Sequence, residues 1–216
     1  MKGKKRSGYA EALFNSLYLG TVLVLGVYRL LSAASIHHLL FGIMALVLLS
    51  GDAFHLLPRI ASALSGDQRR WKRPLGIGKL ITSVGMTLFY ALLWTAGLLW
   101  FSPPGARGWT LLAYGLAAVR ILLSVLPQNQ WGEGHSPMAW TVYRNLPFLL
   151  LGGMVGLLFF FYRDVGVPGV RWMWLAILCS FACYLPVVFG AKKYPLLGLL
   201  MIPKSCAYVW ILTMGL

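Results

Sequence analysis

Asp52 and His55 are the residues of this sequence best suited to acid–base chemistry. They lie three positions apart in a long apolar stretch, and Arg59 follows four positions after His55. Residues spaced in this way share one face of an α-helix, so the three side chains can point toward one site. A carboxylate or a neutral imidazole can take a proton from water. We therefore expect Asp52 and His55 to be catalytic, with Asp52 either the base itself or the group that orients His55.

Basic and polar side chains at a similar depth in other apolar stretches could bind the substrate of such a site. The substrate-binding candidates are Lys79, Arg120, Tyr143, Arg144, Asn145, Lys204 and His135. An ionisable group costs a few kcal/mol in lipid, so its presence there indicates a role. Lys204 is the deepest base, roughly 14 Å from the inner end of its stretch. Two alternatives stay open: Lys79 and Arg144 could extend to the headgroups, and Asp52 could be only the counter-ion of Lys204.

The charge balance of these stretches favours an anion as the ligand. Four bases lie within them against one acid, Asp52, and a phosphate or lipid headgroup would neutralise the excess. Asp52, His55, Glu133 and His135 could together supply zinc ligands, but the surrounding bases oppose a second cation. We therefore expect no metal and no cofactor.

The composition of the chain is that of a membrane protein. Of its 216 residues 59% are hydrophobic and 11% are charged, whereas an average soluble domain carries about 25% charged residues. This excludes a soluble enzyme, a nucleic-acid-binding domain and a disordered chain. The net charge of +14 comes mainly from bases between apolar runs, which is the pattern of membrane topology, so we expect membrane lipids and no nucleic acid as partners.

Seven stretches are apolar and long enough to cross a bilayer, which takes about 20 residues. They are Leu13–Leu31, Ile36–Leu57, Leu75–Phe101, Trp109–Leu126, Met138–Tyr162, Arg171–Gly190 and Pro195–Met214. Continuous apolar runs exclude barrel strands, which alternate. The first run is too long for the core of a signal peptide, so we expect an uncleaved helix. The sequence predicts an all-α, polytopic integral membrane protein of the cell membrane, with one seven-helix transmembrane domain over residues 1–216.

The bases between the stretches orient the chain in the membrane. Eleven fall on the side of the N-terminus, namely Lys2, Lys4, Lys5, Arg6, Arg59, Arg69, Arg70, Lys72, Arg73, Lys192 and Lys193, and four on the other side, namely Arg29, Arg107, Arg163 and Arg171. Since bases are enriched on the cytoplasmic side, we expect an N-in, C-out topology. In that orientation every ionisable residue at membrane depth lies in the cytoplasmic half. This predicts one polar pocket there, which the loop of residues 128–135 could cover.

A short motif resembles a known family. The tract Leu48-Leu49-Ser50-Gly51-Asp52, at the end of an apolar helix, is similar to the Gly-Asp motif of lysoplasmalogenase-like small membrane proteins. The last two predicted helices also resemble that family in their pattern. The resemblance implies a polytopic enzyme that cleaves the vinyl ether bond of lysoplasmalogens with aspartates from two helices. Only Asp52 matches, because Ser180-Phe181 stands where the second, Ser-Asp, motif would fall.

Three functions of different classes fit these features. The first is a membrane-embedded enzyme acting on an anionic phospholipid, in which Lys79, Arg120 and Lys204 bind the phosphate and stabilise developing negative charge. The second is a carrier or binding subunit for a small organic anion, favoured by Lys204 beside Pro203 near the midplane. The third is a structural or regulatory partner protein, including a homo-oligomer packed through the GxxxG of Gly152–Gly156. A wide lateral opening would favour the enzyme, a sealed midplane cavity the carrier, and fully paired polar residues the third.

Overall fold

The structure, a computed structural model, describes residues 2–32, 35–65, 68–133, 136–165, 167, 169–191 and 193–214. The α-helices are α1 (Lys2–Leu31), α2 (Ile36–Ser65), α3 (Gln68–Phe101), α4 (Ala106–Val125), α5 (Met138–Phe161), α6 (Met173–Gly190) and α7 (Met201–Thr213). Short 3₁₀ helices are η1 (Pro127–Asn129), η2 (Trp131–Glu133), η3 (Val170–Trp172) and η4 (Pro195–Leu200). The described residues contain no strand. Seven helical segments are long and apolar enough to cross a membrane, so the prediction of an all-α seven-helix bundle is confirmed.

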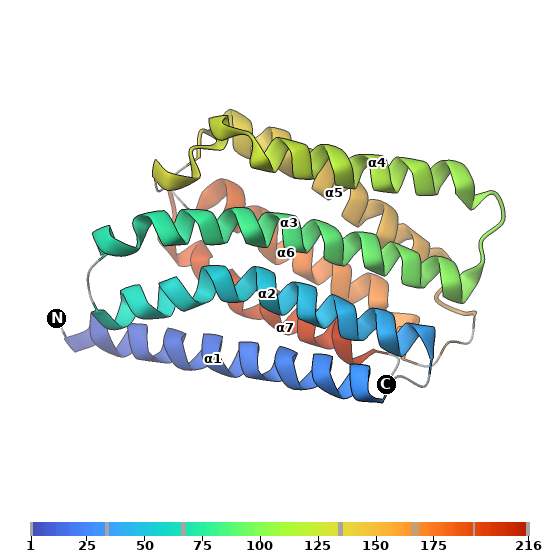
Figure 1. The fold of residues 1–216 in the computed structure, drawn as a ribbon, viewed down its shortest axis with the longest axis horizontal. Helices are drawn as coiled ribbons and strands as arrows, with labels where there is room; N and C mark the ends of the chain where they lie inside the picture. The colour runs from blue at the N-terminus through green and yellow to red at the C-terminus, as the bar shows by residue number, and fades with distance from the viewer. Residues whose placement is uncertain are drawn as a thin grey trace.

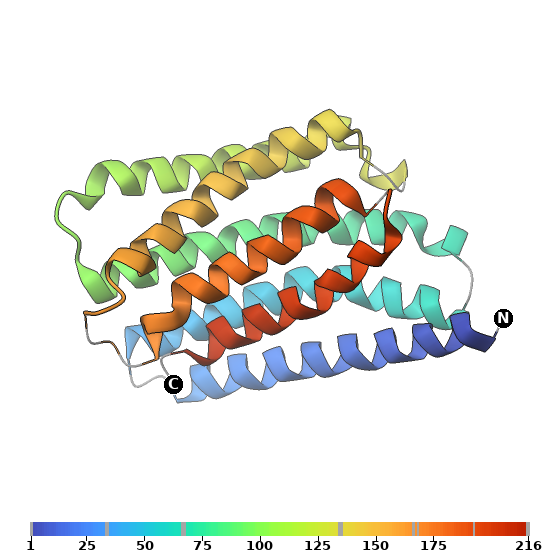
Figure 2. The ribbon, with the colours of Figure 1, turned by 180° about the vertical axis from the view of Figure 1, so that it is seen from behind.

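Successive α-helices run in opposite directions, so the two chain ends lie at opposite ends of the bundle (Figures 1 and 2). We call the end that holds the N-terminus the N-end and the other the C-end. The connections α2–α3, α4–α5 and α6–α7 lie at the N-end. Helix α3 is central and packs on α2, α4 and α5, while α1 packs mainly on α2.

Several helix boundaries differ from the predicted spans. Helices α1, α2 and α3 extend beyond their apolar stretches at the N-end, where their bases lie. The last predicted span is divided into η4 and α7, so Pro203 does not break a helix. It lies in the first turn of α7, where a missing backbone N–H has no intrahelical partner to lose.

The buried core is rich in aromatic side chains. Tyr90 has edge-on ring contacts with Phe89, Phe148 and Phe181, which joins α3 to α5 and α6. Many large apolar side chains point outward instead, among them Leu111, which is 76% exposed. Such exposure is costly in water and favourable in lipid.

The GxxxG of α5 is used within the chain. A side chain at Gly152 would collide with the ring of Phe181 on α6, and one at Gly156 would contact Ile177. These two glycines therefore bring α5 and α6 close together, and this face of α5 is not free for the helix of a second copy. Homo-oligomerisation by other faces stays a prediction.

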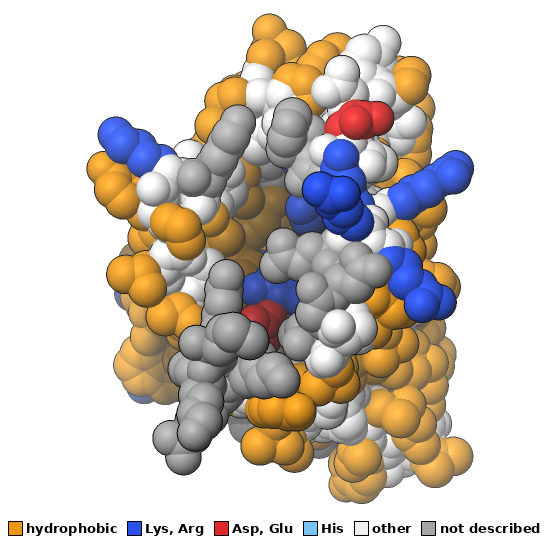
Figure 3. Space-filling model, turned by 90° about the vertical axis from the view of Figure 1, so that its left-hand side faces the viewer, with side chains coloured by type: hydrophobic (Ala, Val, Ile, Leu, Met, Phe, Trp, Pro, Cys, Tyr) orange, Lys and Arg blue, Asp and Glu red, His pale blue; other side chains and the backbone are white. Residues whose placement is uncertain are grey.

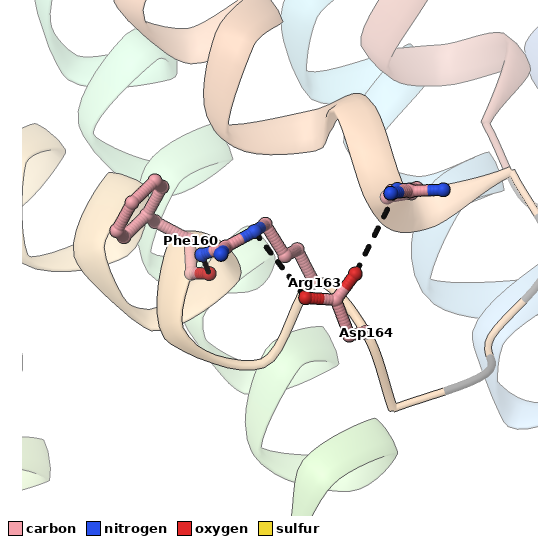
Figure 4. Close-up of polar contacts among 4 residues, drawn as sticks. Phe160, Arg163 and Asp164 are labelled. Atoms are coloured by element: carbon pink, nitrogen blue, oxygen red, sulfur yellow. Dashed lines mark hydrogen bonds and ion pairs between the residues drawn. The ribbon is translucent and has the colours of Figure 1, made fainter.

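Three bases at the C-end, Arg29, Arg163 and Arg171, have hydrogen-bonding or ion-pair partners in the protein. Arg163 donates a hydrogen bond to the carbonyl oxygen of Phe160 at 2.8 Å and pairs with Asp164 at 3.4 Å, and Arg171 pairs with the same carboxylate at 3.7 Å (Figure 4). Arg29 is buried and donates to the carbonyl oxygens of Leu212 and Met214 at 2.7 and 2.8 Å. It thereby ties α1 to the last turn of α7.

Candidate functional site

A cavity of about 690 Å³ lies in the N-end half of the bundle. All seven α-helices, η2 and η4 contribute to its lining. Seen from the N-end, the molecule has a hollow with basic and acidic side chains deep inside it (Figure 3). Six sequence candidates line the cavity, namely Asp52, His55, Lys79, Arg120, Arg144 and Lys204. The structure thus brings together at one place residues from five helices.

Asp52 is held by a tyrosine from another helix. Its Oδ2 accepts a hydrogen bond from the Tyr18 hydroxyl of α1 at 2.7 Å, and only 9% of the residue is exposed. The neighbouring carbonyl oxygen of Gly51 accepts a hydrogen bond from Thr82 of α3 at 2.8 Å. The carboxylate is therefore fixed on α1 and α3 while it faces the cavity.

His55 lies one turn after Asp52 on the same face of α2 and also lines the cavity. No hydrogen bond joins these two side chains in the described structure, and the Nδ1 of His55 is buried without a partner among the described residues. Helix α3 packs tightly here, because a side chain at Gly78 would collide with the backbone of Phe54 and His55. The two candidate catalytic groups are thus placed to act separately on a ligand.

Arg120 is the most deeply buried base of the site, with 2% exposure. Its guanidinium carbon lies 3.2 Å from the ring centroid of Phe148, a favourable contact for a cation. Its Nε and Nη1 have no hydrogen-bond partner within the described residues. Such donors are expensive to bury without acceptors, and a ligand or a water molecule in the cavity would supply them.

Lys204 does not form the direct ion pair with Asp52 that one sequence hypothesis considered. The ion pairs among the described residues do not include these two residues. The Lys204 ammonium lies instead 4.9 Å from the ring centroid of Tyr208 and 5.3 Å from that of Tyr184. Lys204 is 9% exposed and lines the cavity, where the Asp52 carboxylate still attracts it beyond ion-pair distance.

The α4–α5 connection packs beside the cavity and holds Arg144. Arg144 donates to Asn129 at 2.7 Å and to Thr141 at 3.3 Å, and its guanidinium lies 4.3 Å from the ring centroid of Trp131. Trp131 lines the cavity and donates from its indole to the carbonyl oxygen of Ser124 at 2.9 Å. A side chain at Gly76 would collide with the carbonyl group of Trp131, so a glycine lets this connection lie directly on α3.

Two of the described sequence candidates do not line the cavity as expected. Tyr143 is 55% exposed and packs edge-on against Trp140, because adjacent residues of a helix point about 100° apart and Arg144 takes the inner face. Asn145 is buried, donates to the Thr141 carbonyl oxygen at 2.7 Å and accepts from the Tyr184 hydroxyl at 2.6 Å, so it positions a cavity residue. His135 lies outside the described residues.

Sequence reasoning missed the tyrosines of the site. Tyr18, Tyr184 and Tyr208 are aromatic residues in apolar helices, and nothing in their spacing separates a cavity tyrosine from a core tyrosine. It also missed the ion pair between Glu11 and Arg59 at the cavity lining. Among the described residues, five bases and two acids line the cavity. The site therefore keeps the excess of positive charge that the sequence predicts.

The metal hypothesis gains no support from the described residues. They contain no group of three or more His, Cys, Asp or Glu placed to hold a metal ion. Glu133, one of the considered ligands, does not line the cavity, and its exposed carboxylate lies 3.9 Å from the Lys72 ammonium.

No acid stands at the position of the second aspartate that the lysoplasmalogenase resemblance implies. Ser180 is buried within 2.9 Å of the Tyr90 hydroxyl, and Phe181 packs on the same ring and on Phe148. Comparison with known proteins returned no matching family model, no matching curated protein and no matching solved structure. The site therefore stands on its own geometry, and the family resemblance stays a prediction.

Proposed function

We propose that this protein is a membrane-embedded enzyme that hydrolyses an anionic phospholipid in the N-end cavity. The observation that carries the proposal is the cavity itself, in which Asp52 and His55 face a ligand space together with the deeply buried Arg120 and Lys204. A volume of about 690 Å³ lies within the usual range of ligand sites. We place the protein in the cell membrane with its N-terminus in the cytoplasm, as the distribution of bases favours.

In the proposed reaction the bases bind and the acid–base pair acts on water. Arg120 and Lys204 hold the phosphate and stabilise negative charge that develops nearby. Asp52, oriented by Tyr18, or His55 takes a proton from the attacking water. For a vinyl ether lipid, a proton must also be delivered to the vinyl carbon while water adds to the carbon that bears the ether oxygen. The resulting hemiacetal then breaks its C–O bond to give a fatty aldehyde and the glycerophosphate-bearing alcohol, the reaction that the lysoplasmalogenase resemblance implies.

The lining supports an enzyme over the two other classes. A purely structural protein would pair its buried polar groups, yet Arg120 keeps two unpartnered nitrogen atoms in the described structure. A carrier would hold its ligand in a sealed midplane cavity, whereas Leu196 and Leu199 of η4 line this one and are 79% and 62% exposed. An opening beside exposed apolar residues suits a substrate that enters from the bilayer.

The test is turnover of defined lipids by the protein in nanodiscs, with products measured by mass spectrometry. The panel contains lysoplasmenyl lipids and lysophospholipids with anionic and zwitterionic heads. We expect hydrolysis by the wild type and a loss of about 100-fold or more in Asp52→Asn, as for removal of a general base. Asp164→Asn, which changes an exposed acid at the C-end, is the matched control and should keep full activity. Absence of turnover across the panel, or turnover that survives Asp52→Asn and His55→Gln together, would contradict the proposal.

A further inference from the structure

The charges of the cavity specify what kind of headgroup it can hold. Both acids of its lining have hydrogen-bonding partners in the protein: Glu11 pairs with Arg59, and Asp52 accepts from Tyr18. Arg144 is bound by the neutral side chains of Asn129 and Thr141. The ion pairs of the described residues leave Lys79, Arg120 and Lys204 without a carboxylate within bonding distance.

Two of these three bases are buried close enough to repel each other. Arg120 and Lys204 are 2% and 9% exposed and repel each other, while the Asp52 carboxylate attracts Lys204. The aromatic rings of Phe148, Tyr184 and Tyr208 face them. A contact with a ring stabilises a buried cation less than an ion pair with a carboxylate does. Lys79 lines the same cavity and is more exposed. The five bases of the lining exceed its two acids by three, so more than one negative charge is needed to balance them.

A phosphate monoester meets this requirement and a zwitterionic head does not. A monoester carries about −1.5 to −2 charges at pH 7 and has three terminal oxygens that accept hydrogen bonds. A phosphodiester with a choline or ethanolamine group carries one negative charge and brings a cation into a site that already has an excess of cations. The two acids of the lining, Glu11 and Asp52, are already fewer than its five bases and cannot also balance such a cation.

One side of the cavity is apolar. Phe14 of α1, Val187 and Val188 of α6, and Leu196 and Leu199 of η4 all line it. Because the two leucines are also strongly exposed, this wall continues to the molecular surface. An acyl chain can follow it from the buried bases to this exposed apolar surface.

We propose that the ligand of this cavity is a lipid phosphate monoester, with its phosphate between Arg120 and Lys204 and its chain along α1 and η4. The proposal rests on the proposed function and names its substrate class. The proposal concerns binding, so its test measures affinity and requires no hydrolysis of the ligand.

The experiment measures binding to the detergent-purified full chain by ligand-dependent thermal unfolding. The probes are oleoyl lysophosphatidic acid, oleoyl lysophosphatidylcholine, glycerol 3-phosphate and inorganic phosphate. We expect lysophosphatidic acid to raise the unfolding temperature and to bind at least tenfold more tightly than each of the others. The two soluble phosphates test whether a free phosphate ester, rather than a lipid, is the natural source of the anion.

Arg120→Met is the decisive variant, because it removes the buried charge and keeps an apolar side chain against Phe148. We expect its ligand-free unfolding temperature to equal or exceed that of the wild type and its affinity for lysophosphatidic acid to fall at least tenfold. If Arg120→Met fails to fold, Lys204→Gln provides a second measurement of the loss of affinity for lysophosphatidic acid. Arg171→Met, at the C-end, is the matched control and should bind as the wild type does.

Each result that would overturn this inference can be distinguished from a failure of the proposed function. Equal affinity for lysophosphatidic acid and lysophosphatidylcholine would overturn the headgroup inference, even where the protein hydrolyses a lipid. Lysophosphatidic acid affinity that survives Arg120→Met and Lys204→Gln would overturn the placement of the phosphate, and glycerol 3-phosphate binding as tightly would overturn the lipid part. Selective binding with no hydrolysis of any lipid would support this inference and contradict the enzymatic proposal.

Discussion

Arg29 at the C-end and Arg120 at the N-end are buried to almost the same extent, at 1% and 2% exposure, yet their surroundings differ. The Arg29 guanidinium donates to two carbonyl oxygens of the α7 terminus and lies 4.9 Å from the Phe41 ring centroid. The Arg120 guanidinium has an aromatic face and a cavity, and two of its nitrogen atoms find no acceptor among the described residues. Burial of a base therefore does not by itself indicate a binding role. The two arginines differ in whether the protein supplies hydrogen-bond acceptors for them.

The same contrast holds for the two halves of the bundle. At the C-end, Arg163 and Arg171 share Asp164 (Figure 4), and His37 stacks on Trp100 with ring centroids 4.5 Å apart. At the N-end, five bases and two acids line one open cavity. The C-end groups named above have partners within the protein, whereas the N-end groups line a cavity that we propose to be a binding site. Substitutions at the two ends should accordingly affect different measurements.

The largest expected effect on stability is at Arg29. Arg29→Met removes two hydrogen bonds from a buried cation and leaves the carbonyl oxygens of Leu212 and Met214 without a donor. A hydrogen bond to a charged group contributes about 1.5–3 kcal/mol, so we expect a loss of about 3 kcal/mol or more. Unfolding of the detergent-solubilised protein by denaturant titration measures it. If Arg29→Met lowers the unfolding free energy by no more than Arg120→Met does, the proposed difference between a structural arginine at the C-end and a binding arginine at the N-end would be contradicted.

A smaller effect is expected at Tyr18, which belongs to both structure and site. Tyr18→Phe removes the hydrogen bond to Asp52 and should cost about 2 kcal/mol of unfolding free energy. It should also lower turnover, because the carboxylate loses its orienting donor. Tyr28→Phe is the control, since Tyr28 lies on the same helix and is 57% exposed. If both variants behaved alike, the hydrogen bond would have no role in placing Asp52.

The smallest effect is expected at Asp164. Its ion pairs with Arg163 and Arg171 involve side chains that are between 37% and 67% exposed. Exposed pairs contribute about 0.2–1 kcal/mol and are screened by salt. Asp164→Asn should therefore change the unfolding free energy by less than about 1 kcal/mol at moderate salt, with unaltered lipid binding. A loss comparable to that of Arg29→Met would show that the C-end loop contributes more than its exposure indicates.

The sequence predicts the helices and the depth of the polar residues well, because hydropathy alone determines both. Asp52, Lys79, Arg120 and Lys204 come to one cavity because they lie at one level on antiparallel helices. The rotation of each helix about its own axis depends on packing, which one sequence does not reveal. Hence Tyr143 faces outward beside Arg144.

Long-range partners are the second part that the sequence does not predict. Tyr18 and Asp52 are separated by 34 positions, and Arg29 and Leu212 by 183. No local pattern identifies these residues as partners, and the position of Arg29 near the end of an apolar stretch is typical of a base beside a loop. The sequence also does not predict the division between η4 and α7, which falls before Met201, whereas Pro203 lies within the first turn of α7, where a helix tolerates it.

The most direct test of the central claim is mass spectrometry of the lipid that the detergent-purified protein retains. We claim that the buried, unpartnered bases of the N-end cavity hold an anionic lipid. The account predicts that wild type and Arg171→Met retain a phosphate-bearing anionic lipid above its share in the membrane, and that Arg120→Met does not. Equal retention by all three proteins, or a retained lipid population that matches the bulk membrane, would contradict it.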